Sequence, residues 1–260
     1  MAELITRKDK AVGWIIFSNP TKFNAVSHDM WMALPGAIAA FDADPEVRLL
    51  AITGDGDKAF ISGADISQFE KSRGSAEAQA IYNRAVVEAY EAPVRCSKPV
   101  VAKIRGICMG GGLGLAAACD VRIAAEDAQF RMPAARLGLG YNFTGISRFV
   151  QLLGQANTAD IFFSARKFAA ADALAMGFVN RVVAVADLDR EFDAYCELLA
   201  ENAPLTMAAA KFAIRQTAAD PALRDLDQVA RMIEACFNSE DYREGRKAFM
   251  EKRKPSFTGK

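Results

Sequence analysis

The sequence predicts an α/β fold that ends in a helical region. Short apolar runs typical of strands alternate with segments of helical periodicity up to about Gly145, and strand, turn, helix, strand recurs there. After Gly145 the segments are mostly helical. No flexible linker divides the two parts, so we expect a core at residues 1–202 and a packed helical region at 203–260.

The first third of the chain predicts a hairpin followed by a helix. Leu4–Thr6 and Ala11–Phe17 have strand character around the polar turn Lys8–Lys10. Ser27 is placed to cap a helix whose apolar residues recur at helical spacing, namely Trp31, Leu34, Ile38 and Phe41.

The middle of the chain alternates strands and helices. The predicted strands are Arg48–Thr53, Pro99–Ile104 and Val121–Ala125, and the predicted helices are Ala76–Arg95 and Gly112–Cys119. Beyond it, helices are predicted at 145–153, 156–164, 169–176, 187–202, 205–218 and 222–250, with Val179–Val183 as the one strand among them.

Composition excludes several classes of function. The 260 residues are 52% hydrophobic with a formal net charge of zero, which argues against nucleic acid or an anionic membrane as a partner. The charged start, MAELITRKDK, predicts no secretory signal. Five cysteines without CxxC spacing predict a reduced, cytoplasmic protein. With one histidine, His28, at a predicted helix start, we expect neither a His-rich metal site nor a Ser-His-Asp triad centred elsewhere.

Two glycine-containing turns are the candidates for chemistry. KAFISGADI (58–66) follows a strand, and KPVVAKIRGICMGGGLGLAAACD (98–120) passes from a strand through three glycines into a helix. A helix N-terminus offers free N–H groups and the positive end of a dipole. If the N–H groups of Ala64 and Gly111 converge, they form an oxyanion hole for a thioester carbonyl. The alternative is that the glycines serve only tight turns and close packing.

A dinucleotide site is a second alternative. Gly112, Gly114 and Ala117 fit the G-x-G-x-x-A spacing after a strand, and Glu126 and Asp127 end the next strand. Against it, the acidic pair follows too soon after the glycines and the later chain lacks further βαβ units.

The paired motifs resemble the crotonase superfamily, which includes enoyl-CoA hydratases and isomerases. FNAV (23–26), AQFRMPAARLGL (128–139), ALAMGFVNRVV (173–183) and SEDYREGRKAFMEKRKPSF (239–257) add to the resemblance, which spans nearly the whole chain. It implies a spiral of ββα turns with a C-terminal helical trimerisation region, assembled as a homotrimer or a dimer of trimers. It also implies acyl-CoA as substrate, no metal, and no cofactor beyond the substrate's own coenzyme A.

By the same resemblance, specific residues are expected to meet the ligand. The amides of Ala64 and Gly111 are the expected oxyanion hole. The residues expected to contact CoA are Lys22, Phe23, Ala59, Ser62, Asp65 and Ile66, joined by Phe249 and Lys252 of a neighbouring subunit.

The chain departs from the family's hydratases at both catalytic carboxylates. Their positions are occupied by Gly114 and Ala134, which transfer no proton. LGLGYNFTGI (137–146) and the C-terminal motif resemble instead the methylmalonyl-CoA decarboxylase branch, whose tyrosine corresponds to Tyr141, although that branch has a histidine at the Ala64 position. Three interpretations stay open: a lyase reaction through a base-free enolate, such as decarboxylation; a hydratase or isomerase with substitute residues; and a catalytically silent acyl-CoA-binding homologue.

Overall fold

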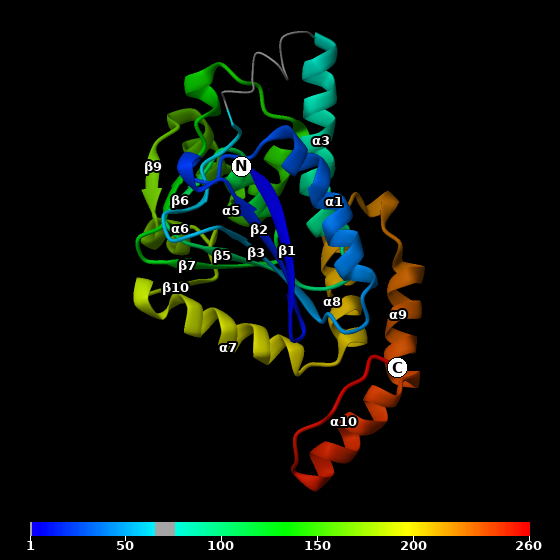
Figure 1. The fold of residues 1–260 in the computed structure, drawn as a ribbon. Helices are drawn as coiled ribbons and strands as arrows, with labels where there is room; N and C mark the ends of the chain where they lie inside the picture. The colour runs from blue at the N-terminus through cyan, green and yellow to red at the C-terminus, as the bar shows by residue number, and fades with distance from the viewer. Residues whose placement is uncertain (1, 66–75) are drawn as a thin grey trace.

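A six-stranded sheet begins with an antiparallel hairpin. The computed structural model describes residues 2–65 and 76–260 (Figure 1). β1 (Glu3–Asp9) pairs with β2 (Val12–Ser18) around Lys10, whose φ is 51°. From β2 onward the sheet is parallel, in the order β1-β2-β3-β5-β7-β10. Its other strands are β3 (Leu49–Gly54), β5 (Val100–Ile104), β7 (Val121–Ala125) and β10 (Arg181–Val183), which confirms the predicted strands.

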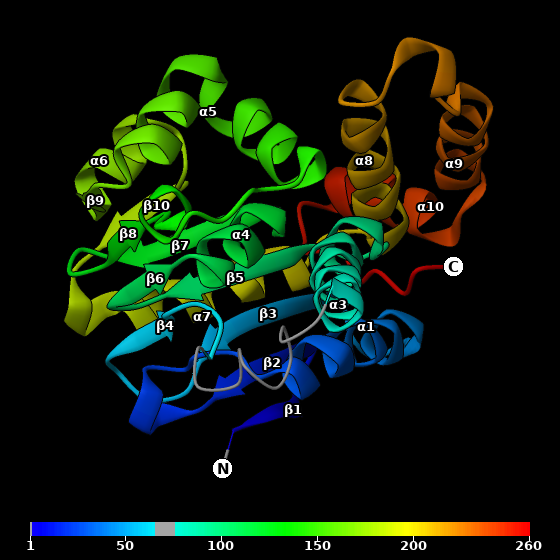
Figure 2. The same ribbon diagram turned by 90° about the horizontal axis from the view of Figure 1, so that it is seen from above.

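A second, four-stranded sheet lies beside the first (Figure 2). Its strands, in spatial order, are β4 (Ala59–Ile61), β6 (Ile107–Met109), β8 (Gln129–Arg131) and β9 (Lys167–Ala169). The sequence did not predict them, because three residues are too few to display an alternating pattern. The expectation of a single strand after residue 145 was therefore wrong, since β9 precedes β10.

The chain adds strands to the two sheets alternately and so forms a spiral. Each turn adds a strand to the large sheet, then a strand to the small sheet, then a helix: β3, β4 and α3; β5, β6 and α4; β7, β8 and α5. The helices are α3 (Ala76–Arg95), α4 (Gly111–Ala118) and α5 (Phe143–Ser164), the last broken at Gly154 where φ is 73° and ψ is 170°. This confirms the ββα spiral.

Apolar side chains fill both faces of the large sheet. Alternate residues such as Ile15 and Phe17 pack toward the small sheet and α1 (His28–Ala43). Trp14 and Ala51 face α7 (Leu188–Ala200), whose Phe192 lies 5.5 Å from Trp14 between ring centroids. The Ser27 hydroxyl accepts a hydrogen bond from the Met30 amide, so the predicted cap is confirmed.

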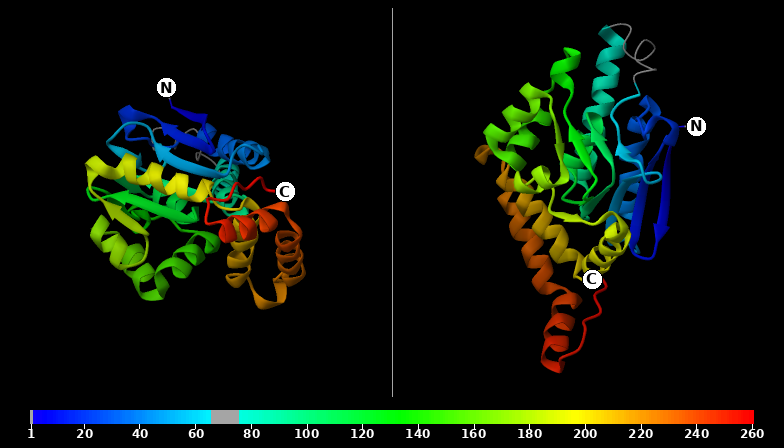
Figure 3. Two further views of the ribbon diagram at one scale, coloured as in Figure 1. Left: turned by 90° about the horizontal axis from the view of Figure 1, so that it is seen from below. Right: turned by 90° about the vertical axis from the view of Figure 1, so that its left-hand side faces the viewer.

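The last third of the chain leaves the sheets. The remaining helices are α6 (Ala170–Ala175), α8 (Pro204–Thr217), α9 (Leu226–Asn238) and α10 (Glu240–Glu251), with 3-10 turns at Pro20–Lys22, Ala134–Leu137, Val185–Asp187 and Pro221–Leu223. The predicted helix 222–250 is two helices, because Ser239 caps a new one by accepting from the Tyr242 amide. α10 projects away from the sheets (Figure 3). No helix in the described ranges is long and apolar enough to cross a bilayer.

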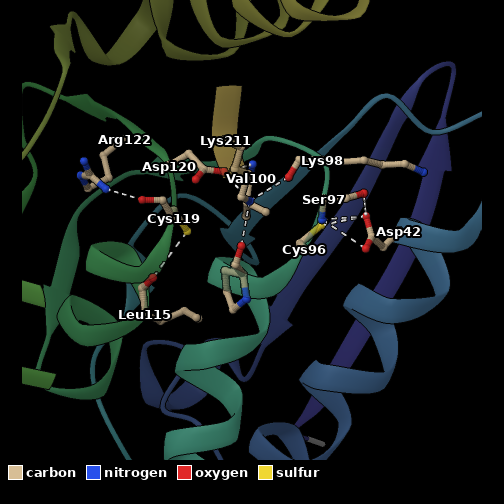
Figure 4. Close-up of polar contacts among 11 residues, drawn as sticks. Asp42, Cys96, Ser97, Lys98, Val100, Leu115, Cys119, Asp120, Arg122 and Lys211 are labelled. Atoms are coloured by element: carbon tan, nitrogen blue, oxygen red, sulfur yellow. Dashed lines mark hydrogen bonds and ion pairs between the residues drawn. The ribbon is translucent and has the colours of Figure 1, made fainter. Parts of the chain in front are cut away.

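A mostly buried lysine side chain anchors α8 to the core. The Lys211 ammonium lies 2.7 Å from an Asp120 carboxylate oxygen and donates to the carbonyls of Pro93 and Lys98, both at 2.8 Å. Asp120 also accepts the Val100 amide at the start of β5. Figure 4 shows these contacts beside the Asp42–Ser97 cluster, which joins α1 to the turn before β5. The C-terminal helices are thus fixed at α8.

Candidate active site

The two glycine turns of the sequence meet in space. A Cβ atom placed on Gly110 would lie 3.8 Å from the Gly63 Cα, and one placed on Gly63 would lie 4.0 Å from the Gly111 amide nitrogen. Gly63 has φ of 122° and Gly110 has φ of 52°, conformations that favour glycine. The two turns therefore touch at these glycines, and Ala64 and Gly111 follow directly after them along the chain.

Both amides remain available to a ligand. Val26 bridges to the first turn by donating its amide to the Gly63 carbonyl and accepting the Asp65 amide, which leaves the Ala64 amide out of the bridge. Gly111 is the first residue of α4, where an amide has no acceptor within the helix. In the described part of the chain neither amide has an acceptor, and both residues are only half-buried. Chemically, such a pair suits an anionic oxygen.

Two tyrosine hydroxyls occupy the space beside Gly114. A Cβ atom on Gly114 would lie 2.6 Å from the Tyr90 hydroxyl oxygen and 2.7 Å from that of Tyr141. Tyr90 donates to the Gly111 carbonyl at 3.1 Å, so it also supports the first turn of α4. The Tyr141 hydroxyl is enclosed and, within the described residues, has no hydrogen bond of good geometry even though Tyr90 is its neighbour.

Burial keeps both phenols neutral. It raises the pKa of Tyr141 to about 12, an effect that the neighbouring Tyr90 hydroxyl partly offsets. Burial likewise raises the pKa of Tyr90 well above its usual value of 10.0, and the adjacent Tyr141 raises it further. At neutral pH both groups are hydrogen-bond donors, and neither is a base.

Ala134 adjoins the same site. It is 7% exposed and opens the 3-10 turn after Pro133, whose ring lies 3.7 Å from the Cβ position of Gly110. Only a methyl group projects there. Two nearby polar residues have structural roles, since Arg131 donates to the Ala165 carbonyl and Asn142 caps α5 by accepting the Gly145 amide.

A cavity of about 240 Å³ opens behind Gly114. It is lined by α3, α4, the start of α5 and α8, and both tyrosines belong to its wall. Glu91, one residue after Tyr90, also lines it. Sequence reasoning missed Tyr90 and Glu91, because nothing in the helical periodicity of α3 reveals which residues face α4. The one available signal was Gly114 itself, whose missing side chain leaves room for a large neighbour.

The comparisons with known proteins decide the family. The family model for enoyl-CoA hydratase/isomerase matches residues 7–260. The chain belongs to the enoyl-CoA hydratase/isomerase family. A crotonyl-CoA hydratase from Syntrophomonas wolfei is 32% identical, over 99% of this chain and 98% of its own. A peroxisomal Δ(3,5)-Δ(2,4)-dienoyl-CoA isomerase from Arabidopsis thaliana is 30% identical, over 96% of this chain and 93% of its own.

Solved structures of this family share the fold. A crystal structure described as an enoyl-CoA hydratase/carnithine racemase from Magnetospirillum magneticum has a TM-score of 0.93 at 32% identity, covering 100% of this chain and 97% of its own. A putative family member from Hyphomonas neptunium also gives 0.93, at 32% identity over 99% and 98% of the two chains. This confirms the crotonase-type fold that the motifs resembled.

A dinucleotide site is excluded by the packing of the glycines. In this family member β6 intervenes between β5 and α4, and a Cβ on Gly112 would lie 2.3 Å from the Ile61 carbonyl oxygen. Gly112 therefore serves the close approach of α4 to β4. Over the described residues, no group of three or more His, Cys, Asp or Glu side chains is arranged to hold a metal ion.

Several residues expected to contact CoA lie together on one side of the glycine turns. Lys22 bonds Asp65 at 2.9 Å, and the Ser62 amide and hydroxyl donate to the carbonyls of Phe23 and Lys22. Phe23 is 46% exposed, whereas Ala59 is buried in β4, so its side chain offers little surface to a ligand.

The other expected CoA contacts do not join this group within one chain. Ile66 lies outside the described residues. Phe249 is 86% exposed near the end of α10, and Lys252 follows that helix as its left-handed cap residue. α10 projects away from the 3-10 turn at Pro20–Lys22 and from β4, so within one chain these two residues lie apart from the other expected CoA contacts (Figure 1).

Proposed function

We propose that the protein binds an acyl-CoA thioester with its carbonyl oxygen between the amides of Ala64 and Gly111. The reaction proceeds through an enolate that no carboxylate base has to generate. The observation that carries this proposal is the pair of neutral tyrosine hydroxyls beside Gly114, where the family's hydratases carry a carboxylate. One amide donor of this kind contributes about 3 kcal/mol to the transition state.

Decarboxylation of a malonyl-type thioester fits these groups best. The bond between the α carbon and the carboxylate carbon breaks, its electron pair becomes the enolate, and CO₂ leaves. In this proposal the neutral tyrosine hydroxyls beside Gly114 disfavour the full charge of the α-carboxylate more than the dispersed charge of the transition state. In this proposal the Tyr141 hydroxyl gives its proton to the carbanionic carbon and regains a proton from water. Its lack of a hydrogen-bond partner among the described residues supports this role. In this scheme the protein is a lyase.

One observation favours a second candidate, hydration or isomerisation with a substitute base. Glu91 lines the same cavity as Gly114 and is half-buried. A carboxylate that reaches the α or β carbon of an enoyl-CoA through a water molecule would replace the missing glutamates. A silent acyl-CoA-binding homologue remains the third alternative, supported by the same missing glutamates.

One assay separates the three candidates. The protein is incubated with crotonyl-CoA, a longer enoyl-CoA and methylmalonyl-CoA, and the products are identified by mass. We expect loss of CO₂ from methylmalonyl-CoA and very slow hydration of crotonyl-CoA. Brisk hydration that Glu91→Gln abolishes would establish the second candidate instead. Tight binding without turnover of any substrate would establish the third.

The ligand also bears on assembly. Lys22 and Phe23 are proposed to meet the nucleotide end of CoA, with Phe249 and Lys252 supplied by a neighbouring subunit of a trimer or a dimer of trimers. The exposure of Phe23 and Phe249 supports this arrangement.

A further inference from the structure

Two arginines at the cavity behind Gly114 have no polar partner in the described part of the chain. Arg148 of α5 and Arg215 of α8 both line it and are half-buried. Within residues 2–65 and 76–260, neither guanidinium has a hydrogen bond or an ion pair, and the Arg215 group lies only over the Phe212 ring, 4.9 Å from its centroid. A half-buried guanidinium presents five donors that water alone satisfies poorly.

The cavity as a whole favours an anion. Among the described residues Glu91 is the one acidic residue of its lining, and no ion pair joins it to either arginine. The first turn of α5 also lines the cavity, so the positive end of that helix faces the same space. At the wall beside Gly114 the Tyr141 hydroxyl adds an enclosed donor without a partner among the described residues.

The position of Arg215 is built into the fold. Lys211 lies four residues earlier on α8, on the same helix face, and is fixed by Asp120 and two backbone carbonyls. The guanidinium therefore stands on a helix that is anchored one turn away. This distinguishes it from a surface arginine such as Arg253, which folds back on the Glu244 carboxylate.

We infer that the substrate's acyl group carries a second carboxylate, remote from the thioester, which Arg148 and Arg215 bind. The substrate is then a CoA thioester whose acyl chain ends in a carboxylate, and this terminal carboxylate is distinct from an α-carboxylate that decarboxylation would remove. This inference rests on the proposed acyl-CoA function and names its substrate class. The thioester lies at the amides of Ala64 and Gly111, and the acyl chain reaches the cavity past Tyr90 and Tyr141, whose side chains line the cavity wall beside Gly114. At about 240 Å³, against ~30 Å³ for one water, the cavity accommodates a short chain.

The test is a binding measurement with saturated acyl-CoAs, which undergo no hydration. Dissociation constants are measured calorimetrically for adipyl-CoA and glutaryl-CoA and for their uncharged counterparts hexanoyl-CoA and pentanoyl-CoA. We expect the carboxylated member of each pair to bind roughly 10-fold or more tightly, as for a charge-assisted contact. Arg148→Gln and Arg215→Gln should each remove most of that preference. Glu91→Gln should increase the preference for the carboxylated ligand, because it removes a negative charge that repels the ligand's carboxylate.

Two controls identify a specific loss. Arg190→Gln changes an exposed arginine of α7 that is paired with Asp187, and it should leave the preference intact. Affinity for butyryl-CoA should stay unchanged in all variants, which verifies that the site is folded. The inference is overturned if hexanoyl-CoA binds as tightly as adipyl-CoA, or if the preference survives both arginine substitutions. The binding measurement involves no turnover, so a failed decarboxylation assay would not affect the measured preference. Equally, a missing preference would not affect the outcome of the decarboxylation assay.

Discussion

At the scale of single residues, the site is defined by what replaces two carboxylates. Ala134 contributes a methyl group, and Gly114 contributes no side chain but receives two phenol hydroxyls from α3 and from the segment before α5. The two phenols differ in their bonding. The Tyr90 hydroxyl donates to the Gly111 carbonyl, whereas the Tyr141 hydroxyl has no hydrogen-bond partner among the described residues. We therefore expect a structural role for Tyr90 and a chemical role for Tyr141.

Substituting each tyrosine by phenylalanine should separate these roles. Tyr141→Phe removes a donor without a protein partner, so the melting temperature should change little. Turnover should fall about 5- to 150-fold, which corresponds to about 1–3 kcal/mol. Tyr90→Phe, the matched control, loses a hydrogen bond worth about 0.5–1.5 kcal/mol and should lower the melting temperature. Full turnover in a Tyr141→Phe protein of lower stability would make Tyr141 a structural residue.

The pH dependence follows from the direction of the pKa shifts. Burial raises the Tyr141 pKa to about 12, above the usual 10.0, so its protonated form stabilises the fold fully below pH 10. That contribution is lost only as the pH rises from 10 through 12. We expect kcat/KM for methylmalonyl-CoA to be level between about pH 6 and 9. An acidic limb near neutral pH would indicate a carboxylate base and contradict the proposal.

At the scale of elements, the fourth residue of α4 has room for no side chain. The sequence suggests that combining Gly114→Glu with Ala134→Glu should increase hydration, but the structure predicts a clash at the first added atom. Gly114→Ala alone should destabilise the protein by about 1–3 kcal/mol, as overpacking does. Gly36→Ala, also helical but with no atom within 4 Å of its Cβ position, should stabilise it by up to about 1 kcal/mol. Denaturant unfolding of both variants tests this difference in sign.

The Lys211 anchor of α8 should also be measurable. Lys211→Met leaves the Asp120 carboxylate and two carbonyls without their cation, which should cost about 1–3 kcal/mol. Lys254→Met removes the exposed pair with Glu201 and should cost less than about 1 kcal/mol. Equal melting temperatures for the two variants would mean that α8 is held by its apolar contacts alone.

The elements differ in how far their sequence predicts them. α3 has the predicted bounds, and the long strands of the large sheet match apolar runs, because five or more residues reveal their period. The short strands do not show such a period in the sequence; they are β4, β6, β8 and β9. Two of them, β4 and β6, nevertheless lead directly into the two glycine turns. The turns themselves were predictable, since Gly63 and Gly110 need conformations that favour glycine. Several polar residues of the cavity could not be predicted, because only the tertiary fold brings four helices around one cavity. These residues are Tyr90, Glu91, Arg148 and Arg215.

At the scale of the whole molecule, one chain leaves apolar surface uncovered. α9 has no buried residue, and its Ile233 and Phe237 are 47% and 59% exposed. On α10, Phe249 and Met250 are 86% and 83% exposed. An apolar surface of this extent on adjacent helices is typical of an interface between subunits. The same region carries both residues that are expected to reach a neighbour's CoA site.

We therefore expect light scattering at micromolar concentration to give three or six times the mass of the 28.1 kDa chain. Phe237→Asp should shift the protein toward monomers, because a charge cannot be buried in an apolar interface without a partner. Met32→Glu on α1, at a position that is 58% exposed, should leave the mass unchanged. A monomeric native protein would contradict the expected assembly.

Assembly and ligand binding should then be coupled. Phe237 lies on α9, outside the expected CoA contacts, so in a self-sufficient subunit its substitution would not alter CoA affinity. If Phe249 and Lys252 complete a neighbour's site, Phe237→Asp monomers should bind CoA more weakly than the native assembly, by an amount similar to Lys252→Ala in the intact assembly. Adding Lys252→Ala to the monomer should then cause no further loss, because the contact is already absent. An additive loss would place Lys252 at the CoA site of its own chain.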